Sequence, residues 1–198
     1  MVKSCFSGIL MLCAAVPALA QTASFVDSAT GVSFQYPKEW KRADGNQFYS
    51  PPTMVPQSAQ VLGAVVWSAG KPQKTTLSGA QFLYAFDKNA SSEACLHPHN
   101  EGDSAKPVID TVRIGSISYA HNHAENAGMC HQEQENVYTA YVNNACYLFD
   151  LSVHTICSGV VDGMRDATPS EVGAIHAKLE DILKTVQIGP AGAVTTHP

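Results

Sequence analysis

The clearest pattern of apolar and polar positions lies in two alternating segments within residues 137–155. In the second segment every odd position from Tyr147 to Val153 is apolar, which is the period of a strand with one buried face. Asn143 and Asn144 separate the segments, and asparagine tolerates the positive φ angles of a two-residue hairpin turn. The pattern therefore predicts a long β-hairpin at the centre of the fold.

Shorter apolar segments predict further strands on both sides of this hairpin. Residues 31–36 alternate and end at Pro37, whereas residues 61–67 form a nearly continuous apolar run that is typical of a strand inside a sheet. One more short strand is predicted over 46–50, and one or two strands are predicted within 108–123. Most of the chain is thus expected to form sheet.

Helical spacing appears in two places. Phe82, Leu83 and Phe86 recur at helical intervals and predict a helix over residues 78–89. Residues 168–171 combine a threonine cap, a proline at the first helical position and a glutamate at the third, before a long apolar stripe. These elements predict an α+β fold in which a central antiparallel β-sheet has helices packed against it.

The first twenty residues have the pattern of a Sec-type signal peptide. Lys3 precedes an apolar run over residues 9–16, and cleavage is expected after Ala20. A lipid-bearing Cys13 would need a small residue before it, and Leu12 is bulky. We therefore expect a secreted or periplasmic protein with a signal peptide (1–20), a single α+β domain (21–188) and a flexible tail (189–198).

The charge of the remaining chain limits its partners. Loss of Lys3 with the leader leaves 11 basic side chains of the original 12, against 17 acidic ones. The charges are scattered and form no basic patch, which argues against nucleic acid or anionic lipid as a partner. No later segment predicts a transmembrane helix. An envelope protein or a small ligand is the expected partner.

Four cysteines remain after the leader: Cys95, Cys130, Cys146 and Cys157. An even number in an oxidising compartment predicts two disulfides, for which three pairings exist. A regular hairpin around residues 143–144 sets Cys130 opposite Cys157 and leaves Cys95 to pair with Cys146. A bulge in the hairpin would change this register, so the pairing depends on the turn.

Three segments of the chain resemble the PsbP-like fold. They are residues 31–40, where a strand ends in Tyr-Pro and a tryptophan follows, residues 147–151 and residues 182–188. The resemblance implies the same central antiparallel sheet with helices packed on it. Members of this fold are mostly binding or assembly proteins, so the resemblance implies a protein without chemistry of its own, although a fold does not fix a function.

Histidines are frequent in the predicted sheet. Five side chains of the type that binds transition metals lie there: His121, His123, His131, Glu133 and His154. A three-residue loop at 126–128 would set His121 opposite Glu133, which the hairpin sets opposite His154. Such a row predicts a site for Zn²⁺ or Cu²⁺. A shift of one residue in either turn would send alternate members to opposite faces.

No catalytic motif accompanies these patterns. The chain lacks a Gly-x-Ser-x-Gly elbow, a His-Glu-x-x-His helix and a phosphate-binding loop. The expected function is therefore a secreted or periplasmic binding or assembly domain that is not an enzyme and needs no cofactor. One rival is a metal-binding protein that uses the histidines. The other is a small hydrolase that uses Ser152 or Ser158 beside His154.

Overall fold

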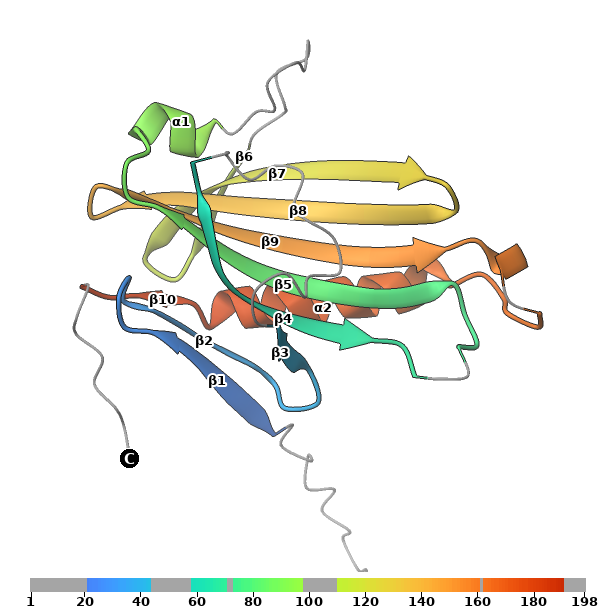
Figure 1. Cartoon of the computed structure of the whole chain (residues 1–198). Coiled ribbons are helices and arrows are strands. Elements are labelled where there is room, and N and C mark those ends of the chain that lie inside the picture. The colour runs from blue at the N-terminus through green and yellow to red at the C-terminus, as the bar shows by residue number, and fades with distance from the viewer. Residues whose placement is uncertain (1–20, 44–57, 71–72, 98–109, 161, 191–198) are drawn as a thin grey trace, which may run out of the picture.

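A computed structural model describes residues 21–43, 58–70, 73–97, 110–160 and 162–190 (Figure 1). These residues form two antiparallel sheets and two α-helices. The larger sheet has the order β3-β4-β5-β9-β8-β7-β6. Its strands are β3 (Lys41–Ala43), β4 (Gln60–Ser68), β5 (Leu77–Asp87), β6 (Asp110–Ile114), β7 (Ile117–Gly128), β8 (His131–Val142) and β9 (Ala145–Ile156). The smaller sheet has the order β1-β2-β10, with β1 (Thr22–Asp27), β2 (Val32–Pro37) and β10 (Gln187–Ile188).

The helices are α1 (Ser92–Leu96) and α2 (Pro169–Lys184), and a 3₁₀ turn spans Ser158–Val160. The expected combination of antiparallel sheet and packed helices is confirmed, but the sheet dominates and only α2 is long. No helix among the described residues is long and apolar enough to cross a membrane. The expected leader (1–20), the strand at 46–50 and residues 191–198 lie outside the described ranges.

The predicted hairpin is the centre of the large sheet. Asn143 and Asn144 have φ angles of 53° and 60°, and they join β8 to β9 as the asparagine pair predicted. Strand β9 lies between β5 and β8. Its odd positions from Tyr147 to Val153 are buried as expected, but its even positions are buried too. Strand β9 is therefore enclosed on both faces, which the alternation alone did not indicate.

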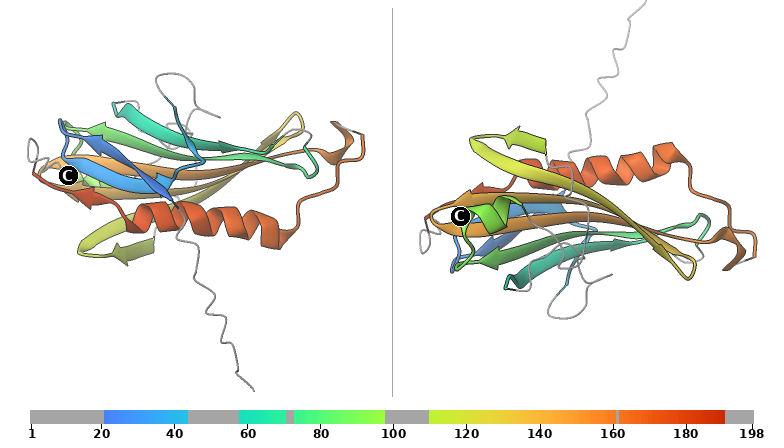
Figure 2. Two further views of the ribbon diagram at one scale, coloured as in Figure 1. Left: turned by 90° about the horizontal axis from the view of Figure 1, so that it is seen from below. Right: turned by 90° about the horizontal axis from the view of Figure 1, so that it is seen from above.

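Helix α2 and the small sheet cover the same face of the large sheet (Figure 2). Phe34 of β2 packs on Phe82 of β5 with ring centroids 4.9 Å apart, and Phe25 of β1 lies against Tyr84. Four buried residues of α2 join the same core: Ile175, Leu179, Ile182 and Leu183. We call this the helix face of the sheet. The other side, which α2 does not cover, is called the open face, although its central residues are also buried.

The helix predicted over residues 78–89 is wrong, because these residues form strand β5. Phe82, Leu83 and Phe86 do recur at helical spacing, but Phe82 faces the helix face while Leu83 faces the open face. Strand β5 lies in the interior of the sheet and is buried on both sides over most of its length. Without a solvent-exposed face, a strand loses the alternation that identifies it in a sequence.

The region around Cys95 contains a short helix. Ser91 caps α1 by accepting a hydrogen bond from the backbone N–H of Ala94 at 3.1 Å. Cys95 is buried and its Sγ lies 2.05 Å from that of Cys146. Cys130 and Cys157 form the second pair. These are the pairs that the hairpin register indicated.

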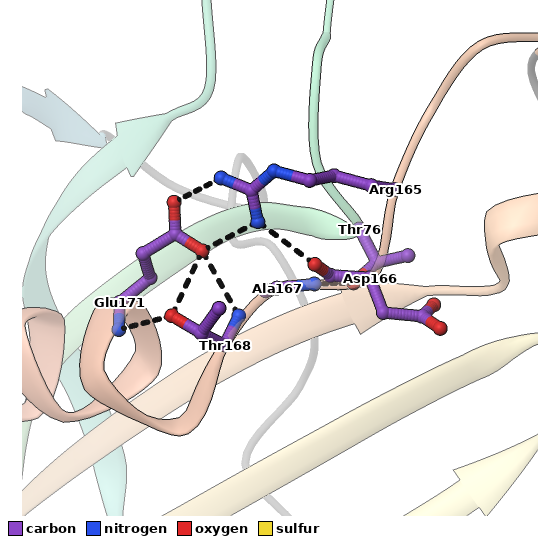
Figure 3. Close-up of polar contacts among 6 residues, drawn as sticks. All are labelled: Thr76, Arg165, Asp166, Ala167, Thr168 and Glu171. Carbon is purple, nitrogen blue, oxygen red and sulfur yellow. Dashed lines mark hydrogen bonds and ion pairs between the residues drawn. The ribbon is translucent and has the colours of Figure 1, made fainter.

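The start of α2 has the capping arrangement that the sequence predicted (Figure 3). The hydroxyl of Thr168 accepts from the backbone N–H of Glu171 at 3.2 Å, and the Glu171 carboxylate accepts from the backbone N–H of Thr168 at 2.9 Å. The Arg165 guanidinium donates to both carboxylate oxygens of Glu171 at 2.8 and 2.6 Å. Hydrogen bonds from Arg165 hold the pKa of Glu171 at about 2.

Replacing Thr168 with alanine is expected to lower the free energy of unfolding by about 1 kcal/mol, because an N–H at the start of α2 loses its acceptor. Chemical denaturation monitored by circular dichroism measures the loss. Thr168→Ser keeps the hydroxyl and is the matched control. An equal loss in the serine and alanine variants would show that the methyl group, not the cap, stabilises this end of α2.

Candidate functional site

The turn between β7 and β8 decides which side chains meet. It lies at Met129 and Cys130, whose φ angles are 47° and 65°, and not at residues 126–128 as expected. His121 consequently pairs with Tyr138 instead of Glu133. The expected and the observed pairings of β7 with β8 differ by five residues. A shift by an odd number of residues moves every side chain of one strand to the opposite face of the sheet with respect to its partner strand.

The predicted row of metal ligands is therefore wrong as a single site. His121 and His123 lie on the helix face, where His123 pairs with Asn136. His131 and Glu133 project from the other side of β8, on the open face, and Glu133 lies opposite His154 as the hairpin predicted. The five side chains are thus divided between two faces of the sheet. Among the described residues, no group of three or more His, Cys, Asp and Glu side chains is arranged to hold a metal ion as it stands.

The open face carries an unusual set of buried polar side chains on neighbouring strands. We call it the acidic cluster, and its members are Gln81, Glu133, Glu135, Asp150, Ser152 and His154. Register accounts for the grouping, because Ser152 lies between Gln81 of β5 and Glu135 of β8. From Asp150 to His154, the alternation of β9 thus places apolar groups on the helix face and polar groups on the open face, although both are buried.

Asp150 is the most unusual member of the acidic cluster. It is fully buried, and neither of its carboxylate oxygens has a hydrogen-bond partner. Burial, and then the charges of Glu135 and Glu133, raise the pKa of Asp150 well above its usual value. An unsatisfied buried carboxyl group costs stability, and groups of this kind are concentrated at functional sites.

His154 and Glu133 form the solvent-facing end of the acidic cluster. Their side chains are 10% and 12% exposed, with Nε2 of His154 3.6 Å from Oε1 of Glu133. Burial, and secondarily the nearby His131, lower the pKa of His154 to about 4. His154 is therefore neutral at pH 7 and adds no positive charge beside Glu133.

Ser152 also approaches His154, but the geometry does not match that of a catalytic triad. Its hydroxyl oxygen lies 3.3 Å from Nε2 of His154, the same nitrogen that faces Glu133. A triad needs the acid on one ring nitrogen and the nucleophile on the other. Ser152 is also fully buried, so it presents no nucleophile to a substrate. The arrangement gives no support to the hydrolase interpretation.

A cleft of about 720 Å³ opens at this end of the sheet. Its walls come from β5, the ends of β7 and β9, and the start of β8: Ser78, Asn126, Ala127, Gly128, His131, Gln132, Glu133, His154, Thr155 and Ile156. Among the described residues, the lining contains one carboxyl group, two histidines and several hydroxyl and amide groups, but no lysine or arginine. Glu133 is thus the acidic group that this lining presents to the cleft.

A second polar group lies on the helix face, and we call it the histidine cluster. It consists of His121, His123, Asn136 and His176, joined by hydrogen-bond contacts of 3.0 to 3.5 Å. The sequence reasoning missed His176, which is 53 residues beyond His123. Its only signal is its position in the predicted helix next to the buried Ile175. Only the packing of α2 on the sheet brings it to the other two histidines.

No protein-family model matches the chain, and no curated protein matches it. Nine chains of solved structures match, and three of them illustrate the low identity. One, from Bacteroides thetaiotaomicron VPI-5482, has a TM-score of 0.48 and 12% identity over 88% of this chain. The match spans only 50% of the Bacteroides chain. Another is LpqN, involved in cell envelope biogenesis of Mycobacterium tuberculosis, with a TM-score of 0.38 and 10% identity over 77% of this chain and 93% of that chain.

The third is the solution structure of cyanobacterial PsbP (CyanoP) from Synechocystis sp. PCC 6803. It has a TM-score of 0.41 and 12% identity, and the match covers 91% of this chain and 99% of that chain. The resemblance that the sequence indicated is confirmed to this extent: a PsbP is among the solved structures to which this chain is similar.

Proposed function

We propose that this chain is an extracytoplasmic binding domain without chemistry of its own, and that its cleft holds a positively charged group of a ligand or partner. One observation carries the proposal. In the part of the chain that the structure describes, the cleft is lined by the carboxyl group of Glu133 and by no basic side chain other than histidine. Because His154 stays neutral at pH 7, it adds no positive charge that would repel a cation.

The rest of the acidic cluster supports the same assignment. Glu135 and Asp150 lie behind Glu133 on the open face and are fully buried. Any negative charge on these carboxyl groups attracts a cation in the cleft more strongly across a region of low dielectric than it would in water. The pairs Cys95–Cys146 and Cys130–Cys157 fit an oxidising compartment outside the cytoplasm. An ammonium or guanidinium group, from a small amine or a basic side chain of a partner, is the chemistry that the cleft would recognise.

Titration of the ¹⁵N-labelled, oxidised protein with spermidine at low salt tests the proposal by NMR. We expect amide shifts concentrated in the cleft residues, and Glu133→Gln is expected to weaken the affinity at least tenfold, or by about 1.4 kcal/mol. Added salt is expected to weaken binding as well. Glu39→Gln is the control, because it removes an exposed carboxylate on the turn after β2. Shifts spread over the whole surface, or an equal loss in both variants, would contradict the proposal.

A further inference from the structure

Three histidine side chains point one ring nitrogen each at the amide group of Asn136. Nε2 of His121 lies 3.0 Å and Nδ1 of His123 lies 3.3 Å from Oδ1 of Asn136. Nδ1 of His176, from α2, lies 3.5 Å from Nδ2 of the same amide. Three imidazoles from a strand and a helix therefore converge on one small polar group.

The other nitrogen of each ring faces an oxygen. Nδ1 of His121 lies 2.9 Å from a carboxylate oxygen of Asp110, and Nε2 of His123 lies 3.5 Å from one of Glu125. Nε2 of His176 lies 3.1 Å from Oε1 of Gln134. Carboxylate and amide oxygens only accept hydrogen bonds, so each outer nitrogen carries the ring proton.

This placement of protons leaves three lone pairs directed at one amide. A neutral imidazole has one N–H, so the inner nitrogens of His121, His123 and His176 are acceptors. The amide of Asn136 has only two hydrogens, and as it lies its oxygen faces two of the three nitrogens. The amide therefore cannot satisfy all three rings in their neutral form.

We infer that the histidine cluster binds one divalent transition-metal ion of the class that prefers imidazole, Zn²⁺ or Cu²⁺, through His121, His123 and His176. A cation satisfies three converging lone pairs at once. Histidines that bind metals usually donate their other N–H to a carboxylate or carbonyl, and all three rings already have such a partner. The outer contacts thus fix the ring orientations that a metal requires.

Asn136 holds the centre of the cluster in the present arrangement. Two nitrogens on one tetrahedral Zn²⁺ lie roughly 3.4 Å apart, so the three rings must come together around the ion in place of the amide. The amide must then turn aside or turn its oxygen to the metal. This requirement explains why the side chains are not at ligand distances as they stand. The inference is independent of the cleft, because the two sites lie on opposite faces of the sheet.

Titration of the oxidised protein with Cu²⁺ at pH 7, followed by calorimetry and electron paramagnetic resonance, tests the inference. We expect one tight site whose spectrum has the nitrogen couplings of three imidazoles. His123→Ala is expected to reduce that number to two and to weaken binding at least tenfold, and His176→Ala is expected to do the same. His131→Ala is the matched control, because it removes an exposed histidine from the other face.

Asp110→Asn provides a second test that leaves all three ligands in place. Its side chain is 68% exposed, so the change carries little risk to folding. Loss of an outer-shell partner of this kind is expected to weaken metal binding by 10- to 100-fold, in the approximate range known for such contacts. Failure to bind Cu²⁺, affinity that is unchanged in His123→Ala and Asp110→Asn, or an equal loss in His131→Ala would each overturn the inference.

Discussion

Replacing both Cys95 and Cys146 with alanine is expected to lower the free energy of unfolding by about 4 kcal/mol. The bond joins residues 51 positions apart, and a cross-link over so long a loop restricts the unfolded chain strongly. It also fastens α1 to the open face through two buried sulfur atoms. Guanidinium denaturation of the oxidised protein measures the loss, and reduction of the wild type, which opens both disulfides, is expected to lower the free energy of unfolding further than this variant does.

The second disulfide gives the matched comparison. Cys130 and Cys157 are 27 positions apart, so the same argument gives roughly 3.5 kcal/mol for the double alanine variant. The expected loss is smaller because this disulfide closes a shorter loop of the unfolded chain. A larger loss in this variant than in the Cys95 and Cys146 variant would contradict the loop argument. Wild-type stability that is unchanged by reducing agent would contradict both pairings.

Asp150→Asn is expected to raise the free energy of unfolding at pH 7 by about 2 kcal/mol. Asparagine has nearly the shape of aspartic acid but cannot ionise, so the variant avoids the cost of a buried carboxylate. In the wild type, neither oxygen of Asp150 has a hydrogen-bond partner that would offset this cost. Urea denaturation at several pH values provides the measurement.

The sign of the pH dependence follows from the raised pKa of Asp150. Well below a pH of about 4 the group is protonated in both the folded and the unfolded chain, and the two proteins should be equally stable. As pH rises toward the folded pKa, the unfolded chain loses its proton first, so the stability of the wild type falls relative to the variant. His154 titrates in the same pH range but is present in both proteins. The difference in their stability therefore reports on Asp150 alone.

Asp162→Asn is the control for this prediction, because Asp162 is exposed. Its stability is expected to follow that of the wild type at every pH. A gain of similar size in both variants would mean that general charge reduction, and not the burial of Asp150, stabilises the protein. Loss of stability in Asp150→Asn at neutral pH would contradict the proposed cost of the buried carboxyl group.

The sequence predicted the elements whose signals are local. The Asn143–Asn144 turn needs two residues that tolerate positive φ, and the Thr168 cap needs a hydroxyl and a glutamate three residues later. Both signals lie within a few residues and were read correctly. Strand β5 was misread as a helix because its identity depends on the strands and layers on either side of it. A strand enclosed on both faces has no exposed side to reveal its period.

The same distinction between local and tertiary signals applies to the candidate sites. The pairing of Glu133 with His154 followed from a turn that the sequence identified. The partners of His121 could not be predicted in this way. They depend on a turn at Met129 and Cys130, which adopt positive φ angles that neither residue type indicates. His176 reaches the histidine cluster only through the packing of α2, and no spacing in the sequence encodes that contact.

By itself, the sequence determined the hairpin, the capped helix α2, the antiparallel sheet and the pairing of Glu133 with His154. The tertiary structure decided which face of the sheet each remaining polar side chain occupies, and hence that one row of expected metal ligands became two separate sites. The physical reason is the two-residue period of a strand. A local turn fixes the register, and a register error of an odd number of residues moves every side chain to the other face.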